Sequence, residues 1–224
     1  MTSRIQMEFM HSNKSHASTN AKLASTIYKK TLIAIGTSTG GPRALQKVLT
    51  DLPDDFSAPI LIVQHMPKRF TKSLAERLNT LTAIHVKEAI HGEIIKNHTA
   101  YIAPGDYHMK ARKQGTSYVI ELTKENPLFG FRPAVDMLLD SFITLEVNKL
   151  AVILTGMGSD GSEGIKRLKK SDAKAVVVAE AAETAIVYGM PKAAVGTKCV
   201  NHIVPLYEIG KTMDDVVRNY RNRI

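Results

Sequence analysis

The stretch TLIAIGTSTGGPRALQKVLTDLP, residues Thr31–Pro53, predicts a strand followed directly by a helix. Thr31–Ile35 is apolar after its first residue, which is typical of a strand buried on both faces of a sheet. Pro42–Leu49 predicts a helix, because proline is favoured at the first helical position and apolar residues fall on one face: Ala44, Leu45, Val48 and Leu49. The turn GTSTGG, residues 36–41, joins the two elements.

The alternation of strand and helix continues after this first unit, which is the pattern of βαβ units and a parallel sheet. The strand-like segments around Gln114-Gly115 instead predict an antiparallel hairpin. We therefore predict an α/β fold: a doubly wound, mostly parallel sheet with helices on both faces and an antiparallel β-hairpin excursion. Further strands are expected at Ile60–Gln64, Leu150–Leu154 and Ala175–Ala179, and further helices at Phe70–Asn79, Pro133–Leu145, Ser162–Lys170 and Tyr207–Tyr220.

The first thirty residues differ in composition from the rest of the chain. They are rich in Ser, Thr, Asn, Lys and His and carry too little apolar surface to fold alone. We predict a flexible polar leader over residues 1–30 and one domain over residues 31–224. Hydrophobic residues make up 44% of the 224. No apolar run approaches the roughly 18 residues of a membrane span, so we expect no membrane insertion.

The chain carries an excess of positive charge. Thirty Lys and Arg against 21 Asp and Glu give a formal net charge of +9, which favours acidic partners through electrostatic steering. The basic residues are scattered, apart from Lys166, Arg167, Lys169 and Lys170 on one predicted helix, so we expect a solvated basic face and no nucleic-acid binding. The single cysteine, Cys199, excludes a disulfide framework and fits a reducing, cytoplasmic setting.

The turn at residues 36–41 fits two functions, phosphate binding and nucleophilic catalysis. A dinucleotide-binding turn, G-x-G-x-x-G, needs glycine where Ser38 stands and an acidic residue where the chain has Gln64-His65. Gly36-Thr37-Ser38-Thr39-Gly40 does match G-x-S-x-G, the pattern of a serine on a sharp strand-to-helix turn. Helix N–H groups would then point at any oxyanion formed there. A serine–glycine turn that only caps the helix would look the same, so the pattern alone leaves both open.

Three polar residues with complementary chemistry follow predicted parallel strands. Ser38 follows the first strand, His65 ends APILIVQH, and Asp160 lies in the loop after LAVILT. In open α/β sheets the carboxyl ends of the strands line the ligand crevice. Acyl transfer uses a serine nucleophile, a histidine base and a carboxylate that orients the imidazole. His65 alone could be a polar surface residue and Asp160 alone a helix cap, but their coincidence at three strand ends favours catalysis.

The chain contains six short motifs in a fixed order: IAIGTSTGGP, VQHM, AYIAPGDYHM, RPAVDMLL, VILTGMGSDG and VYGMP. Together they closely resemble the catalytic domain of the chemotaxis-receptor methylesterase family (CheB), from about Thr31 to near the C-terminus. The resemblance implies a doubly wound, mostly parallel α/β fold. It also implies that Ser38 is the nucleophile, His65 the general base and Asp160 its orienter. Thr39 and Met157 match positions near the family's oxyanion site.

The resemblance further implies an activity. The family hydrolyses methyl esters of glutamate side chains on the cytoplasmic helical bundle of chemoreceptors and releases methanol, and many members also deamidate receptor glutamines. We therefore expect a cytoplasmic serine carboxylic-ester hydrolase, a protein-glutamate methylesterase of bacterial chemotaxis adaptation, with methylated chemoreceptors as partners and glutaminase as a second reaction. The chain has no HExxH or similar ligand spacing, so we expect no metal and no organic cofactor.

Two departures from the family keep other functions open. Members usually carry a phosphorylatable receiver domain before the catalytic domain, whereas only the predicted leader precedes Thr31, so we expect no control by phosphorylation in cis. The chain also has Ala181-Ala182 where the family often has an acidic pair, which affects expected substrate contacts. The alternatives are a noncatalytic module that binds receptors or other partners, and a small-molecule esterase of broad range.

Overall fold

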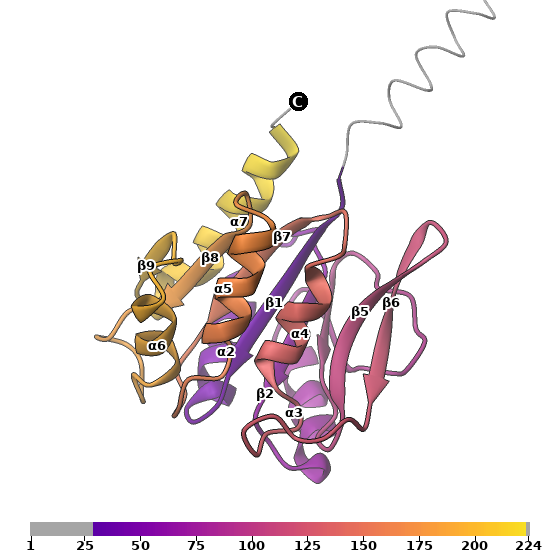
Figure 1. The fold of residues 1–224 in the computed structure, drawn as a ribbon, viewed down its shortest axis with the longest axis horizontal. Coiled ribbons are helices and arrows are strands. Elements are labelled where there is room, and N and C mark those ends of the chain that lie inside the picture. Colours follow the sequence, from indigo (N-terminus) through magenta and orange to yellow (C-terminus); the bar gives the residue numbers. More distant parts are fainter. Residues whose placement is uncertain (1–28, 223–224) are drawn as a thin grey trace, which may run out of the picture.

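The structure, a computed structural model, describes residues 29–222. Its centre is a seven-stranded sheet in the order β3-β4-β2-β1-β7-β8-β9, and every neighbouring pair is parallel (Figure 1). The chain builds the sheet outward in both directions from β1, which confirms the predicted doubly wound fold. The strands are β1 (Thr31–Thr37), β2 (Ile60–Gln64), β3 (His85–Glu88), β4 (Thr99–Ile102), β7 (Asn148–Ile153), β8 (Val176–Glu180) and β9 (His202–Val204).

The helices agree closely with the amphipathic patterns. In α2 the buried side chains include the expected Ala44, Leu45, Val48 and Leu49, and proline lies in its first turn. The helices are α2 (Gly41–Thr50), α3 (Lys68–Asn79), α4 (Val135–Phe142), α5 (Ser162–Ser171), α6 (Met190–Gly196) and α7 (Leu206–Asn222). None of them is long and apolar enough to cross a membrane within the described part of the chain. Of the predicted leader, residues 1–30, only Lys29 and Lys30 lie among the described residues.

The predicted hairpin is present, but it forms a sheet of its own. β5 (His108–Gln114) and β6 (Ser117–Thr123) pair antiparallel, with Gln114 opposite Ser117. Gly115 in the connecting turn has a φ of 59°, a conformation that glycine adopts without steric cost. The expected excursion is therefore a separate two-stranded sheet that packs beside α4 and does not extend the parallel one.

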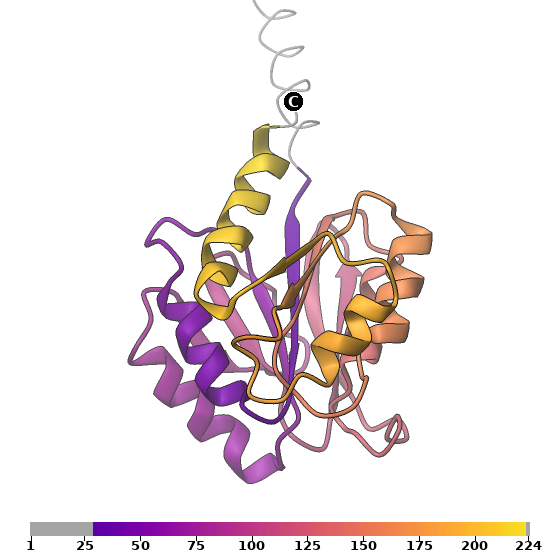
Figure 2. The same cartoon turned by 90° about the vertical axis from the view of Figure 1, so that its left-hand side faces the viewer.

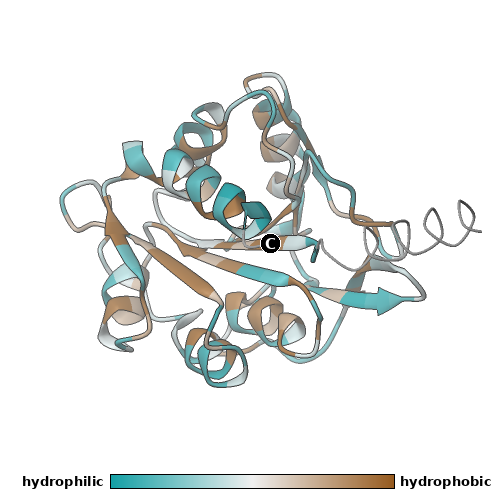
Figure 3. Ribbon diagram, turned by 90° about the horizontal axis from the view of Figure 1, so that it is seen from above, coloured by the Kyte–Doolittle hydropathy of each residue, from teal (hydrophilic) through white to brown (hydrophobic). Residues whose placement is uncertain are grey.

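Helices cover both faces of the parallel sheet (Figures 1 and 2). One buried cluster joins the sheet to α2, α3 and α7, and a second joins it to α4, α5, α6 and the hairpin. Because both faces are covered, β1, β2 and β4 are buried along their whole length. Figure 3 shows the result as apolar strands in the middle of the molecule and hydrophilic colour on the outward sides of the helices.

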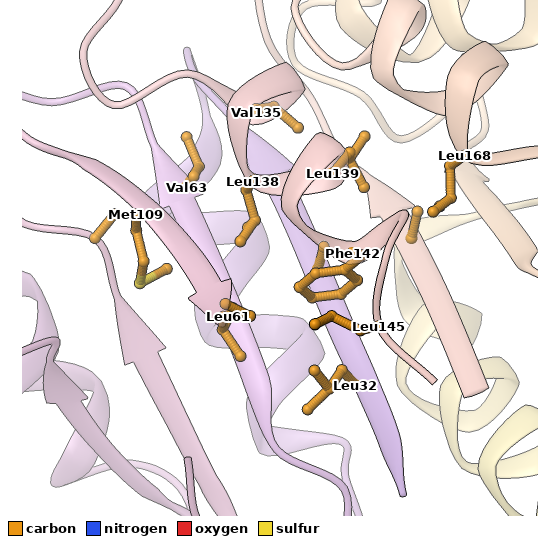
Figure 4. Close-up of a cluster of buried hydrophobic side chains, with 14 of the residues drawn as sticks. Leu32, Leu61, Val63, Met109, Val135, Leu138, Leu139, Phe142, Leu145 and Leu168 are labelled. Carbon is orange, nitrogen blue, oxygen red and sulfur yellow. The ribbon is translucent and has the colours of Figure 1, made fainter. Parts of the chain in front are cut away.

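The helix α4 closes the core directly over the two central strands. Its Leu138 and Phe142 side chains lie over Leu32 of β1 and Leu61 of β2 (Figure 4). All four side chains are 0% exposed. This packing fixes the position of α4, whose N-terminus lies at the same end of the sheet as the turn after β1.

Replacing Phe142 by alanine tests how much this contact stabilises the fold. Removal of a fully buried phenylalanine leaves a cavity, so we expect Phe142→Ala to lower the free energy of unfolding by about 3–5 kcal/mol in urea denaturation. Phe129→Ala is the matched control, because the Phe129 side chain is 78% exposed, and it should cost less than about 1 kcal/mol. Equal losses in the two variants would contradict the described packing.

Candidate active site

The parallel register of β1 and β2 places Ser38 beside His65. Thr37 pairs with Gln64 at the last position of the two strands, so the next residue on each chain is Ser38 and His65. The His65 N–H donates to the Thr37 carbonyl at 3.1 Å, which continues the ladder past the strand ends. Both residues line one open cleft of about 640 Å³.

The turn after β1 holds the Ser38 backbone and leaves its hydroxyl free. The Ser38 carbonyl accepts from the Gly41 N–H at 2.9 Å and from the Gln64 Nε2 at 2.9 Å. Gly40 precedes α2 with a φ of 85°, whereas Ser38 itself is not in the left-handed region. The Ser38 hydroxyl makes no hydrogen bond to any described residue and does not cap α2. Gly40 of the turn is the N-cap, so the alternative in which the Ser38 side chain caps the helix is wrong.

His65 is held on two sides. Its Nε2 lies 2.7 Å from the Asp160 Oδ2, and its ring stacks on Phe131 with centroids 4.0 Å apart and planes 7° from parallel. An ionised carboxylate only accepts hydrogen bonds, so Nε2 is the donor, and in the neutral imidazole Nδ1 is then the acceptor. That Nδ1 is buried and has no partner among the described residues. The imidazole is thus held in place on two sides, and its Nδ1 has no partner in the described part of the chain to compete with an incoming proton.

Asp160 owes its position to the N-terminus of α4. Its Oδ2 accepts from the Val135 N–H at 2.7 Å and its Oδ1 from the Asp136 N–H at 3.0 Å. Helix N-termini favour carboxylates because their first N–H groups lack intrahelical acceptors and the helix dipole is positive there. Asp160 was a candidate cap for the helix that follows it, yet the α5 N-cap is Gly161 without a side-chain hydrogen bond. Asp160 caps α4 instead.

Asp136 makes the reciprocal contact with α5. Its Oδ1 accepts from the Gly161 N–H at 3.0 Å and from the Gly164 N–H at 2.6 Å. The side chain is buried, and this burial, together with the nearby Asp160 charge, raises the pKa of Asp136 to about 6 against the opposing effect of the Gly164 hydrogen bond. The carboxylate at the N-terminus of α4 therefore comes from the loop before α5, and the carboxylate at the N-terminus of α5 comes from α4.

Phe131 belongs to a tight turn beside His65. The Leu128 and Phe131 backbones exchange two hydrogen bonds, of 3.0 and 2.9 Å, around Phe129 and Gly130, both with positive φ. The next residue, Arg132, forms an ion pair with Asp106. This pair and the hydrogen bond from the Asp106 N–H to the Arg132 carbonyl at 3.1 Å anchor the turn to the β4–β5 loop. The stacking ring is thus carried by an anchored loop.

Thr39 and Met157 lie on the two loops that flank Ser38. Thr39 lines the cleft, and its N–H has no acceptor in the described part of the chain. Met157 is 71% exposed and follows Gly156, where an added Cβ would lie 2.9 Å from the Ser38 Cβ. A side chain at position 156 would therefore clash with Ser38, and the Met157 backbone lies next to Ser38. Their part in oxyanion binding stays a prediction.

Sequence reasoning did not single out three residues of this site: Gln64, Phe131 and Asp136. Gln64 ends β2, and the other two lie in or beside the motif RPAVDMLL, so the only signal was membership of a motif whose contacts the sequence does not reveal. Within residues 29–222, no group of three or more His, Cys, Asp or Glu could hold a metal ion.

The buried Asp136 carboxyl predicts a pH dependence of stability. Its pKa rises from 3.8 to about 6 on folding, so the folded protein binds more protons than the unfolded chain between these values. The stability of the wild type relative to Asp136→Asn should therefore fall, by up to about 3 kcal/mol, as the pH rises from about 4 to about 7. Urea denaturation of both proteins across this range measures the difference. A wild type that becomes more stable relative to Asp136→Asn as the pH rises would contradict the assignment.

Three comparisons place the chain among known proteins. The CheB methylesterase family model matches residues 33–213. A relative from Oceanobacillus iheyensis, named protein-glutamate methylesterase/protein-glutamine glutaminase, is 54% identical over 183 residues, 81% of this chain and 52% of the relative. A relative of the same name from Pyrococcus horikoshii is 40% identical over 201 residues, 89% of this chain and 54% of the relative.

A solved structure agrees with these sequence matches. The crystal structure of the Thermotoga maritima CheB methylesterase catalytic domain superposes with a TM-score of 0.81 at 40% identity, and covers 84% of this chain and 100% of that domain. The chain spans about half the length of the curated relatives it matches. The family match, the relatives and the shared fold agree on one conclusion: the chain belongs to the CheB methylesterase family.

Proposed function

We propose that this protein is a protein-glutamate methylesterase, a serine hydrolase that removes methyl esters from glutamates of chemoreceptors in the cytoplasm. The observation that carries the proposal is the 2.7 Å contact between buried Asp160 and His65, which lines the same cleft as Ser38 with its unbonded hydroxyl. Relatives named as methylesterases and glutaminases support this substrate class. Residues 31–224 would form the catalytic domain.

The first half of the reaction uses Ser38 and His65 together. In the structure the two are not hydrogen-bonded, and such contacts often tighten only when substrate is bound. The basic Nδ1 of His65 takes the proton of the Ser38 hydroxyl as its oxygen attacks the ester carbonyl. Backbone N–H groups of the Thr39 and Met157 loops bind the oxyanion that forms. His65 then gives its proton to the departing methoxide, which leaves as methanol, and a glutamyl–Ser38 ester remains.

The second half restores the enzyme. A water molecule gives its proton to the His65 Nδ1 and attacks the glutamyl–Ser38 ester, and His65 then protonates the Ser38 oxygen as glutamate is released. Throughout, Asp160 holds the imidazole plane and stabilises its positive charge when both nitrogens are protonated. With a glutamine substrate the same steps release ammonia, which is the second activity in the relatives' name.

Substitution of the nucleophile tests the proposal. Ser38→Ala should lower methanol release from receptors carrying labelled methyl groups by about 10⁴-fold or more, because the covalent intermediate cannot form. Ser73→Ala is the matched control, since Ser73 lines the same cleft and its hydroxyl only binds the Phe70 carbonyl.

The remaining outcomes separate the alternatives. Methanol release by Ser38→Ala at the wild-type rate would refute the mechanism. Rapid turnover of simple esters with none of receptor would favour a broad esterase. Binding of receptor without any labelling of Ser38 by a serine-directed phosphonate would favour a noncatalytic module.

The positive charge beside the cleft is suited to a substrate rich in glutamate. Phe70, Ser73 and Arg77 of α3 line the cleft, and the next face of α3 lines a groove of about 670 Å³ with Lys68, Arg69 and Lys72. Among the described residues, the only acidic side chain within ion-pair distance of these cations is exposed Glu76, 3.9 Å from Lys72, and Glu88 lines the same groove. On α5, by contrast, Lys166 pairs with Glu163 at 2.6 Å and Arg167 with Asp140 at 2.7 Å. The cations of α3 beside the cleft are therefore less closely paired with acidic side chains than Lys166 and Arg167 of α5.

Two double variants with the same loss of charge test this steering. Arg69→Gln with Lys72→Gln should lower kcat/KM for the receptor about 3- to 10-fold at low ionic strength, and the loss should shrink as salt rises. Lys166→Gln with Lys170→Gln on α5 is the matched control and should change kcat/KM less than twofold. Equal effects of the two pairs, or a loss independent of salt, would remove α3 from the proposal without affecting Ser38.

A further inference from the structure

Thr155, just after β7, contacts the Ser38 turn on the side opposite His65. Its carbonyl accepts from the Ser38 N–H at 3.1 Å and from the Thr37 Oγ1 at 2.8 Å. The side chain is 1% exposed. Because the Ser38 N–H is used in this way, it is not available to an oxyanion, and the donors must come from other peptides of the turn.

The Thr155 hydroxyl joins two more loops. It donates to the Thr39 carbonyl at 2.9 Å and accepts from the Val187 N–H at 2.9 Å. A hydroxyl has one proton, so these two bonds use its donor and one acceptor position. The alternative acceptor, the Val187 carbonyl, lies farther away at 3.4 Å. One side chain thus ties the nucleophile turn to the loop between β8 and α6.

The bond to the Thr39 carbonyl fixes the direction of the next N–H group. In a trans peptide the carbonyl and the following N–H point in opposite directions. Because the Thr39 carbonyl points at Thr155, the Gly40 N–H points away from Thr155. In the part of the chain that the structure describes, this N–H has no acceptor.

Glu180, at the end of β8, binds the backbone of Thr155. Its Oε2 accepts from the Thr155 N–H at 2.7 Å, and the side chain is 0% exposed. The burial raises the pKa of Glu180. Four loops or strand ends therefore meet at Thr155, and three of its groups, N–H, carbonyl and hydroxyl, are all occupied.

We propose that Thr155 is a positioning residue, whose hydroxyl holds the Thr39–Gly40 peptide so that the Gly40 N–H faces the oxyanion formed at Ser38. The inference rests on the proposed function of Ser38 and adds a residue that does not itself touch the substrate. Its effect is on the transition state, because the oxyanion exists only after Ser38 has attacked.

Three variants of the full chain test this role: Thr155→Val, Thr155→Ser and Thr155→Cys. The measured quantities are kcat and KM for methanol release and the rate at which a phosphonate labels Ser38. Thr155→Val keeps the shape but loses the hydroxyl, so we expect kcat and the labelling rate to fall about 10²-fold with little change in KM. Thr155→Ser keeps the hydroxyl and should stay within about threefold of the wild type. Urea denaturation of each variant records its stability separately.

The outcomes are distinct. A wild-type labelling rate in Thr155→Val, an equal loss in Thr155→Ser, or a loss confined to KM would overturn the positioning role. If Thr155→Val does not fold, Thr155→Cys replaces it, because its thiol takes the place of the hydroxyl but is a weak hydrogen-bonding group. Failure of the wild type itself to be labelled at Ser38 would instead refute the proposed function.

Discussion

The position of β1 between β2 and β7 is the constraint on which the rest of the site depends. Parallel pairing on both sides brings the three strand ends to one edge of the sheet, with Thr37 opposite Gln64 and Gly36 opposite Ile153. Ser38 then has His65 on one side and Thr155 on the other without any adjustment of the loops. A shift of one residue in either ladder would turn every side chain at this edge to the opposite face. β1 is buried along its whole length between these two neighbours.

The second requirement is a carboxylate held in a buried place beside the imidazole. A buried charge is unfavourable unless it is hydrogen-bonded, and here the bonds come from the N-terminus of α4. Asp136 does the same for the α5 N-terminus, so the two helices and their two acids stabilise one another. Since Phe142 and Leu138 fix α4 on the sheet, the hydrophobic core determines where Asp160 lies, and Asp160 determines the orientation of His65.

Much of this architecture can be predicted from the sequence. The same physical reasons explain why the other parts cannot. Central strands such as Ile60–Gln64 and helices with one apolar face give strong patterns, and parallel strand ends predict that His65 and Asp160 lie near each other. The short edge strands β3 and β9 are half exposed and have no such pattern. The contacts of Asp136, Phe131 and Thr155 join residues far apart in the chain, and their partners are mostly backbone groups. No local periodicity encodes them.

The central claim is that Ser38, His65 and Asp160 act as one unit. The most direct test is a double-mutant cycle on the rate of Ser38 labelling by a phosphonate, with His65→Gln, Asp160→Asn and the double variant. If Asp160 acts only through the imidazole, the double variant should react no more slowly than His65→Gln alone. If the two losses multiply, Asp160 acts independently of His65, and the account of the site is wrong.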